Sequence, residues 1–254
     1  AKETTMLLDD YRARVDQLFA EVRETQTENI IAAGKLVADA VAAGCNIYLS
    51  NICHYMEYDL LERGGGPTFY KPFRYALELK NYTTHYQARR RTDLPEDRCF
   101  EGLAAYALRQ AHIGKGDVIF LSSVSGQTAS VVDLAYEAEK NGVKVIAFTS
   151  MKYASQLPPV HSSGKKLYEI ATLTIDNCAP AAEAMLEVDW LDSAFAAASG
   201  IATDYILWSL TSVAVEELVK THGIKPAILR SANYPGGAAY NESFAFPQYM
   251  EKGY

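Results

Sequence analysis

The residues with the clearest chemical potential form the string SVSGQT, residues 123–128. Ser123, Ser125 and Thr128 bring three hydroxyl groups, and Gly126 permits a close approach of the backbone. An apolar run precedes the string and an amphipathic pattern follows it, so the string leads from a strand into a helix. Hydroxyl groups and the free N–H groups of a helix N-terminus suit a phosphate. Because the string lacks Lys and Arg, it favours a compact monoester over a triphosphate.

Serine, threonine and glycine also occur in ordinary helix caps, and Thr128 is equally suited to act only as an N-cap. Nucleotide binding is disfavoured, because no G-x-G-x-x-G follows a predicted strand. The string SGKK, residues 163–166, is not a P-loop, since Pro159 occupies the place of the upstream glycine. No cofactor is therefore predicted.

Short apolar strands and amphipathic helices alternate along the chain. The pattern predicts strands at 46–50, 68–70, 118–121, 144–149 and 173–175, helices at 95–111 and 129–140, and a helix-rich stretch that reaches residue 221. Residues 7–43 predict two helices or one bent helix, with a break near Thr25. Strands that are joined through helices pair in parallel. We therefore expect a single three-layer α/β domain over residues 1–254, with an N-terminal helical arm at residues 1–44.

Ligands of an open parallel sheet bind beyond the carboxyl ends of its strands, near the point where the strand order reverses. Two predicted loops lie at such ends, residues 50–55 and residues 122–128. The candidate binding residues of these loops are Ser50, Asn51, His54, Ser123, Ser125, Gly126, Gln127 and Thr128. His54 suits a donor to a phosphate or a hydroxyl group, and it equally suits a structural loop residue.

A third loop combines His161, two serines and Lys165 in the string HSSGK. An imidazole, two hydroxyl groups and an ammonium group are able to open a sugar ring or to hold its hydroxyl groups. The alternative is an ordinary polar surface loop. No H-E-x-x-H and no cluster of Cys and His occurs, so no metal site is predicted.

Composition narrows the class of protein further. The 254 residues are 49% hydrophobic and carry a net charge of −7, which disfavours nucleic acid as a partner. The apolar run at 205–215 is about half the length that a membrane span needs, and is expected to be a buried helix. The N-terminus lacks a signal-peptide pattern, and the cysteines form no C-x-x-C pair. These features predict a cytoplasmic protein without a membrane partner.

The string SVSGQT, together with the helix and strand that follow it up to Ser150, resembles the second signature of the sugar isomerase (SIS) domain family, which binds phosphosugars. Residues 161–177 and the string SANYPGG, with Asn241 after it, resemble an uncharacterised single-domain, phosphosugar isomerase-like branch of that family. The resemblance implies a three-layer αβα sandwich with a five-stranded parallel sheet, a homodimer or homotetramer, and a sugar phosphate that is held by Ser123, Ser125, Gly126 and Thr128.

The resemblance also implies a catalytic base, since family members usually supply a Glu from a helix near the site. Glu57 and Glu101 are the candidates, and His161 is a further catalytic candidate. In its first loop the chain departs from the family, because SNICH replaces the usual G-x-G-x-S. The implied function is a phosphosugar isomerase that transfers a proton through an enediol or enediolate. The alternatives are a sugar-phosphate sensor or partner subunit without catalytic activity, and a lyase or etherase on the same fold.

Overall fold

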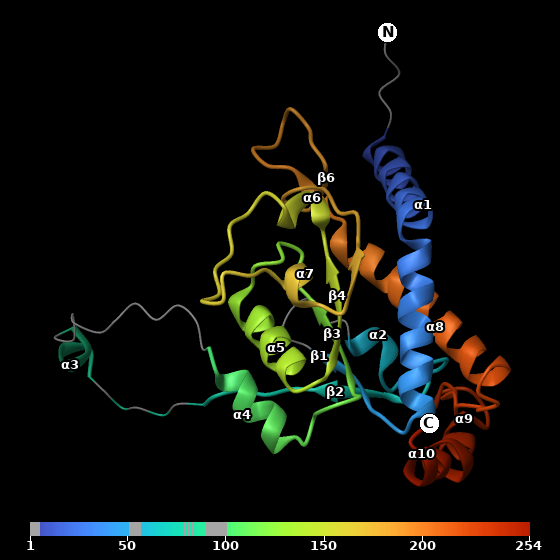
Figure 1. Cartoon of the computed structure of the whole chain (residues 1–254). Coiled ribbons are helices and arrows are strands. Elements are labelled where there is room, and N and C mark those ends of the chain that lie inside the picture. Colours follow the sequence, from blue (N-terminus) through green and yellow to red (C-terminus); the bar gives the residue numbers. More distant parts are fainter. Residues whose placement is uncertain (1–5, 51–56, 79, 81, 83, 90–100) are drawn as a thin grey trace.

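A computed structural model describes residues 6–50, 57–78, 80, 82, 84–89 and 101–254 (Figure 1). The strands are β1 (Ile47–Ser50), β2 (Tyr70–Phe73), β3 (Val118–Ser122), β4 (Lys144–Thr149), β5 (Leu173–Asp176), β6 (Ala184–Leu186) and β7 (Phe195–Ala197). The helices are α1 (Leu7–Ala42), α2 (Glu57–Leu60), α3 (His85–Arg89), α4 (Leu103–Gln110), α5 (Ala129–Lys140), α6 (Met151–Ala154), α7 (Leu167–Ile170), α8 (Ser199–Lys220), α9 (Gly237–Tyr240), the π-helical turn η1 (Asn241–Ala245) and α10 (Phe246–Lys252).

The central sheet has five parallel strands in the order β2-β1-β3-β4-β5, which confirms the predicted fold class. After β1 the chain adds β2 on one side, and it then returns to add β3 on the other side of β1. The strand order therefore reverses between β1 and β3, where Leu49 lies opposite Phe120. In such a sheet this is the place where a ligand is expected.

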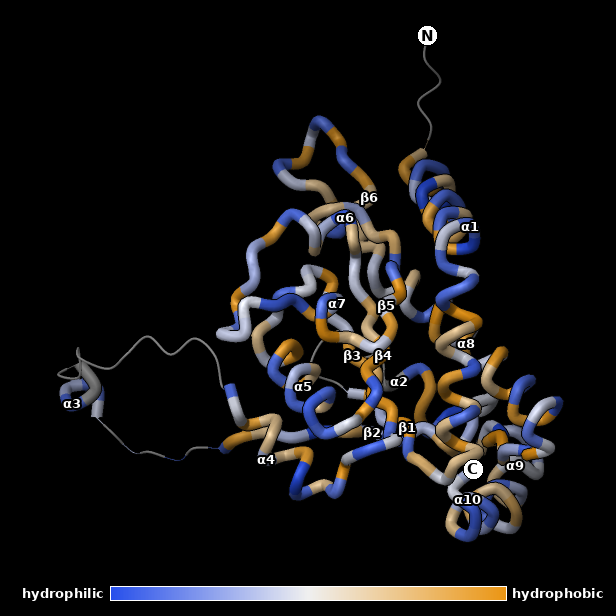
Figure 2. The backbone as a smooth tube through the Cα atoms, in the orientation of Figure 1, coloured by the Kyte–Doolittle hydropathy of each residue, from blue (hydrophilic) through white to orange (hydrophobic). Residues whose placement is uncertain are grey.

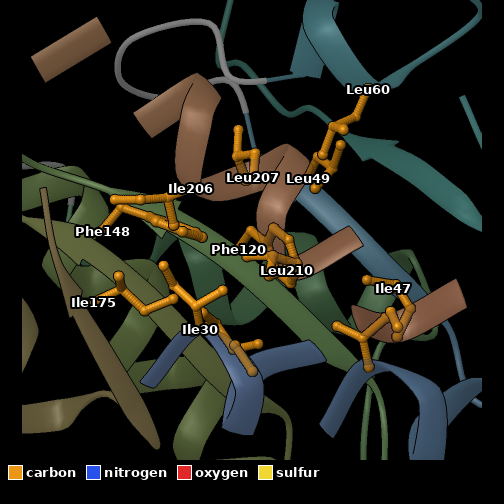
Figure 3. Packing of buried hydrophobic residues seen from close by; sticks show 14 of the residues in the cluster. Ile30, Ile47, Leu49, Leu60, Phe120, Phe148, Ile175, Ile206, Leu207 and Leu210 are labelled. Carbon is orange, nitrogen blue, oxygen red and sulfur yellow. The ribbon is translucent and has the colours of Figure 1, made fainter. Parts of the chain in front are cut away.

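Helices cover both faces of the sheet. On one face, α1 and α8 pack on Leu49, Phe120 and Phe148, and Figure 3 shows side chains of α8 directly over β1 and β3. On the other face, α4, α5 and α7 cover a second cluster that includes Ile119 and Leu121. Figure 2 shows the hydrophobic colour concentrated on β1, β3 and β4, whereas α1 alternates between hydrophobic and hydrophilic residues. The inner strands β1, β3 and β4 are largely buried on both faces, as in other parallel sheets.

The N-terminal segment is one continuous helix, α1, so the predicted alternative of two helices separated near Thr25 is wrong. The Thr25 hydroxyl group donates to the carbonyl of Glu21 at 2.8 Å, inside the same helix, and does not cap a new helix. Buried residues Val22, Ile30 and Val37 continue one apolar face across the expected break. Because α8 packs on this face, a helix that continues past Thr25 buries more apolar surface than one that ends there, and this burial stabilises the single helix.

Three other boundaries differ from the prediction. The strand near residue 68 begins at Tyr70, and the helix before β3 begins at Leu103, while residues 95–100 lie outside the described ranges. The stretch predicted to be rich in helix opens with an antiparallel hairpin, β6 and β7, before α8 begins. The run at 205–215 lies inside α8, where it contributes buried residues to the core. Within the described ranges, none of the helices combines the length and apolar character needed to cross a membrane.

Candidate functional site

The string SVSGQT forms a tight turn between β3 and α5. The Gly126 amide donates to the Ser123 carbonyl at 2.9 Å, and the hydroxyl groups of Ser123 and Thr128 are bonded at 2.9 Å. The carbonyl of Gly126 accepts a hydrogen bond from the amide of Leu167 at 2.8 Å, which ties the turn to α7. These bonds hold the turn in one conformation, so its remaining donors have fixed directions.

Gly126 is required at its position for two reasons. Its φ angle is +67°, which side-chain-bearing residues rarely adopt. A Cβ atom there would also lie 2.9 Å from the Cβ atom of Ala154. The turn therefore packs directly against α6, at the carboxyl end of β4.

Several donors of this turn have no protein partner among the described residues. The amides of Ala129 and Ser130 open α5 and meet no acceptor there, and the half-buried hydroxyl group of Ser125 has no partner in the same ranges. Thr128 occupies the N-cap position of α5, but its side chain accepts no capping bond from the helix amides. Unpartnered amides at a helix N-terminus, beside a free hydroxyl group, form an anion-binding arrangement.

Ser50 ends β1, the strand next to β3, and is only 2% exposed. Its Oγ atom has no hydrogen-bond partner in the described part of the chain. A buried hydroxyl group without a partner is costly, which points to a polar group beside it. Asn51 and His54, the other candidates from this loop, lie outside the described residues.

Two of the predicted catalytic residues meet at the start of α4. A carboxylate oxygen of Glu101 accepts the Ser162 amide at 2.8 Å, and the other oxygen accepts the Ser162 hydroxyl group. The His161 Nε2 atom lies 3.9 Å from Glu101 Oε1. Asp133 of α5, which the sequence analysis did not single out, approaches the same ring atom, with its Oδ1 atom 3.5 Å from Nε2. In the sequence, Asp133 stands out only as a carboxylate between apolar residues of α5, a pattern that indicates a buried acidic side chain.

The contacts of His161 fix the orientation of its ring. The residue is 5% exposed, and its Nδ1 atom accepts the Ser163 amide at 3.1 Å. Nδ1 also lies 2.8 Å from the Ser163 hydroxyl group, which can donate or accept. Nε2 lies toward the carboxylates of Asp133 and Glu101, which accept hydrogen bonds, so this side of the ring interacts with them as an N–H donor. The Nε2–H group therefore faces the two carboxylates.

The remaining candidates are placed differently. Lys165 is exposed, and the neighbouring Lys166 is the buried lysine, whose Nζ atom donates to the carbonyls of Ala154 and Leu157 at 2.9 Å each. Gln127 is half-buried on the turn itself. Glu57 begins α2, but its side chain lies outside the described part of the structure. Across the described ranges, no group of three His, Cys, Asp or Glu residues is arranged to hold a metal ion.

The carboxyl groups of Asp59 in α2 and Asp204 in α8 form a pair where these two helices meet. Burial and the hydrogen bond with Asp59 raise the pKa of Asp204 from 3.8 to about 6. Between these values the folded protein keeps a proton that the unfolded chain has released, so the free energy of unfolding falls as pH rises through this window. We expect Asp204→Asn to be more stable than the parent near pH 7.5 and equally stable near pH 4, as measured by urea unfolding. Asp16→Asn, on the exposed surface of α1, is the control. An advantage of equal size at both pH values would contradict this account.

A family model described as the SIS domain matches residues 10–150, a range that holds the candidate loops at residues 50–55 and 122–128. The chain belongs to the SIS domain family. Similarity also extends along the whole SIS-domain chain in curated relatives. The UPF0309 protein of Halalkalibacterium halodurans is 31% identical over 252 residues, which cover 97% of this chain and 99% of the relative. The UPF0309 protein of Streptomyces avermitilis is 32% identical over 231 residues, or 89% of this chain and 88% of the relative.

Solved structures with a similar fold include a phosphoheptose isomerase from Neisseria gonorrhoeae, with a TM-score of 0.49 and 16% identity, covering 82% of this chain and 94% of that one. The NanR protein of Vibrio vulnificus, complexed with ManNAc-6P, has a TM-score of 0.49 and 15% identity, covering 98% of this chain and 71% of that one. At these values the likeness to this SIS-domain chain concerns the fold alone.

Proposed function

We propose that this SIS-domain chain binds a sugar phosphate at residues 123–128 and interconverts its aldose and ketose forms through an enediolate. The observation that carries the proposal is the set of unpartnered donors at the turn: the Ser125 hydroxyl group and the amides of Ala129 and Ser130, in the part of the chain that is described. These neutral donors match the oxygens of a phosphate monoester. Ser50, buried at the end of the adjacent strand, supplies a further hydroxyl group toward the same ligand.

Proton transfer requires a base near C1 and C2 of the sugar and a donor that polarises the carbonyl group. In the proposed reaction, Glu101 removes the proton from C2 of the aldose, the C–H electron pair forms the enediolate double bond, and the same carboxyl group returns the proton to C1. The hydroxyl proton moves from O2 to O1 in the same cycle. Glu101 is favoured because two bonds from Ser162 orient its carboxylate. Glu57 is the second candidate base.

A sugar-phosphate sensor without catalytic activity is the second candidate function. Its support is the string SNICH at residues 50–54, which lacks the glycines that let a loop backbone approach a ligand closely. In either case the proposal includes a homodimer or homotetramer in the cytoplasm.

The two functions are separated by incubation with a panel of hexose 6-phosphates and pentose 5-phosphates in heavy water. An isomerase is expected to introduce deuterium at C2 of one panel member and to form its ketose, because the base exchanges its proton with solvent between the two transfers. The label is read by NMR, and binding is measured in parallel by calorimetry. Binding without label supports the sensor, while no binding to any member of the panel contradicts the phosphosugar site itself.

A further inference from the structure

Asp133 lies beside the Nε2 atom of His161 and has no role in the function proposed above. Asp133 is 3% exposed in the middle of α5. Both of its carboxylate oxygens accept the Gly102 amide at 3.1 Å, and Oδ2 also accepts the Ala104 amide at 3.3 Å. The carboxylate is therefore fixed by the first turn of α4, directly after Glu101, and its Oδ1 atom faces the imidazole at 3.5 Å.

The imidazole presents its Nε2 atom to two carboxylates. Carboxylates accept hydrogen bonds, so Nε2 interacts with them as an N–H donor, while Nδ1 contacts the amide and the hydroxyl group of Ser163. What His161 offers is an N–H donor that lies between two carboxylates, 3.5 Å from Asp133 and 3.9 Å from Glu101. Hydrogen bonds in catalytic sites are often long before the substrate binds and shorten in the complex.

Resting on the proposed function, in which Glu101 is the base, we propose that Asp133 and His161 are positioning residues for the Glu101 carboxylate. Asp133 fixes the plane of the imidazole ring, and the Nε2–H group, together with Ser162, fixes the direction of the carboxylate. When Glu101 is ionised, the N–H group stabilises its charge, and when Glu101 holds the substrate proton, the N–H group turns to Asp133.

Asp133 lies apart from the residues proposed to bind the phosphate, so its positioning role can be tested separately from substrate binding. The phosphate turn lies at the start of α5, and Asp133 lies more than one helical turn further along the same helix. Within the described ranges its hydrogen bonds are with Gly102, Ala104 and His161, and not with the donors of the turn. Loss of the positioning contacts should consequently lower kcat and leave KM and the affinity for the sugar phosphate nearly unchanged.

The test uses the full chain and the panel member that is labelled in heavy water. Asp133→Asn keeps an oxygen for the amides of α4 and loses the charge that orients the ring. His161→Leu removes the donor, whereas His161→Gln keeps an N–H group near the place of Nε2. We expect Asp133→Asn and His161→Leu each to lower kcat by about tenfold to a hundredfold, with KM changed by less than about threefold, since a small misplacement of a catalytic group has effects of this size. His161→Gln should recover a substantial part of the loss.

The double variant Asp133→Asn/His161→Leu provides a second readout. If Asp133 acts through the ring, the double variant should have the kcat of His161→Leu alone, whereas independent effects would multiply. Asp117→Asn is the matched control, because Asp117 is a buried carboxylate that accepts the amides of Asn46 and Gly114 at the opposite end of β3. This control should lose stability and keep kcat.

Unchanged kcat in Asp133→Asn or in His161→Leu overturns the positioning role, and so does an equal loss in His161→Leu and His161→Gln. If Asp133→Asn does not fold, the two His161 variants decide the question. These outcomes differ from failure of Glu101 as the base, which would show as full activity of Glu101→Gln, and from failure of the proposed function, which would show as binding of no panel member.

Discussion

Glu101→Gln is expected to slow deuterium exchange at C2 of the substrate by about 10²- to 10⁴-fold, which is the usual contribution of a general base. The amide side chain still accepts the Ser162 amide, whose bond to the carboxylate is 2.8 Å long, but it cannot take up the C2 proton. Affinity for the sugar phosphate should therefore change little. Exchange is measured by NMR in heavy water, and affinity by calorimetry.

The control for this variant is Glu169→Gln. The Glu169 carboxylate accepts a hydrogen bond from the Lys166 amide at 2.7 Å at the start of α7. It therefore makes the same kind of bond as Glu101, but has no contact with His161 among the described residues. Its exchange rate should equal that of the parent. Full exchange in Glu101→Gln would transfer the role of base to Glu57, and full exchange in Glu57→Gln as well would exclude both carboxylates.

The second large effect is expected at the phosphate turn. Ser125→Ala should weaken binding of the sugar phosphate by about tenfold to a hundredfold, because a hydrogen bond to a charged group contributes about 1.5 to 3 kcal/mol. The thermal midpoint should stay nearly unchanged, since the Ser125 hydroxyl group has no partner among the described residues. Calorimetric titration and thermal unfolding measure the two quantities.

Thr128→Val should weaken binding to a similar degree and also lower the thermal midpoint slightly. The hydroxyl group of Thr128 bonds that of the buried Ser123 at 2.9 Å, and valine would leave Ser123 without this partner. Ser212→Ala is the control, because it removes an exposed hydroxyl group of α8 that bonds only the carbonyl of Trp208 at 2.8 Å. A large fall of the midpoint in Ser125→Ala with intact binding would show that the turn is a structural element and not an anion site.

Local patterns in the sequence predicted much of the fold. Helix α5 and strand β4 have the predicted bounds, Ala129–Lys140 and Lys144–Thr149, because their apolar periods and the glycine turn between them act over a few residues. The expected break in α1 failed for the opposite reason. Thr25 and Glu28 have the spacing of a helix start, but the buried face of α1 continues past them, and its packing against α8 outweighs that local preference.

One part of the candidate site could be predicted from local sequence patterns, and the other part depends on tertiary packing. The phosphate turn could be predicted, because Ser123, Ser125, Gly126 and Thr128 follow one another in the chain and need only a strand before them and a helix after them. The cluster of Glu101, Asp133 and His161 could not be assembled from the sequence, although two of its members were candidates. Its three residues come from separate segments that meet only when α4 and α5 pack side by side on one face of the sheet and the loop after α6 folds over them. Sequence spacing encodes the period of a single element, whereas distances between elements depend on the order of the strands and on the face that each helix covers.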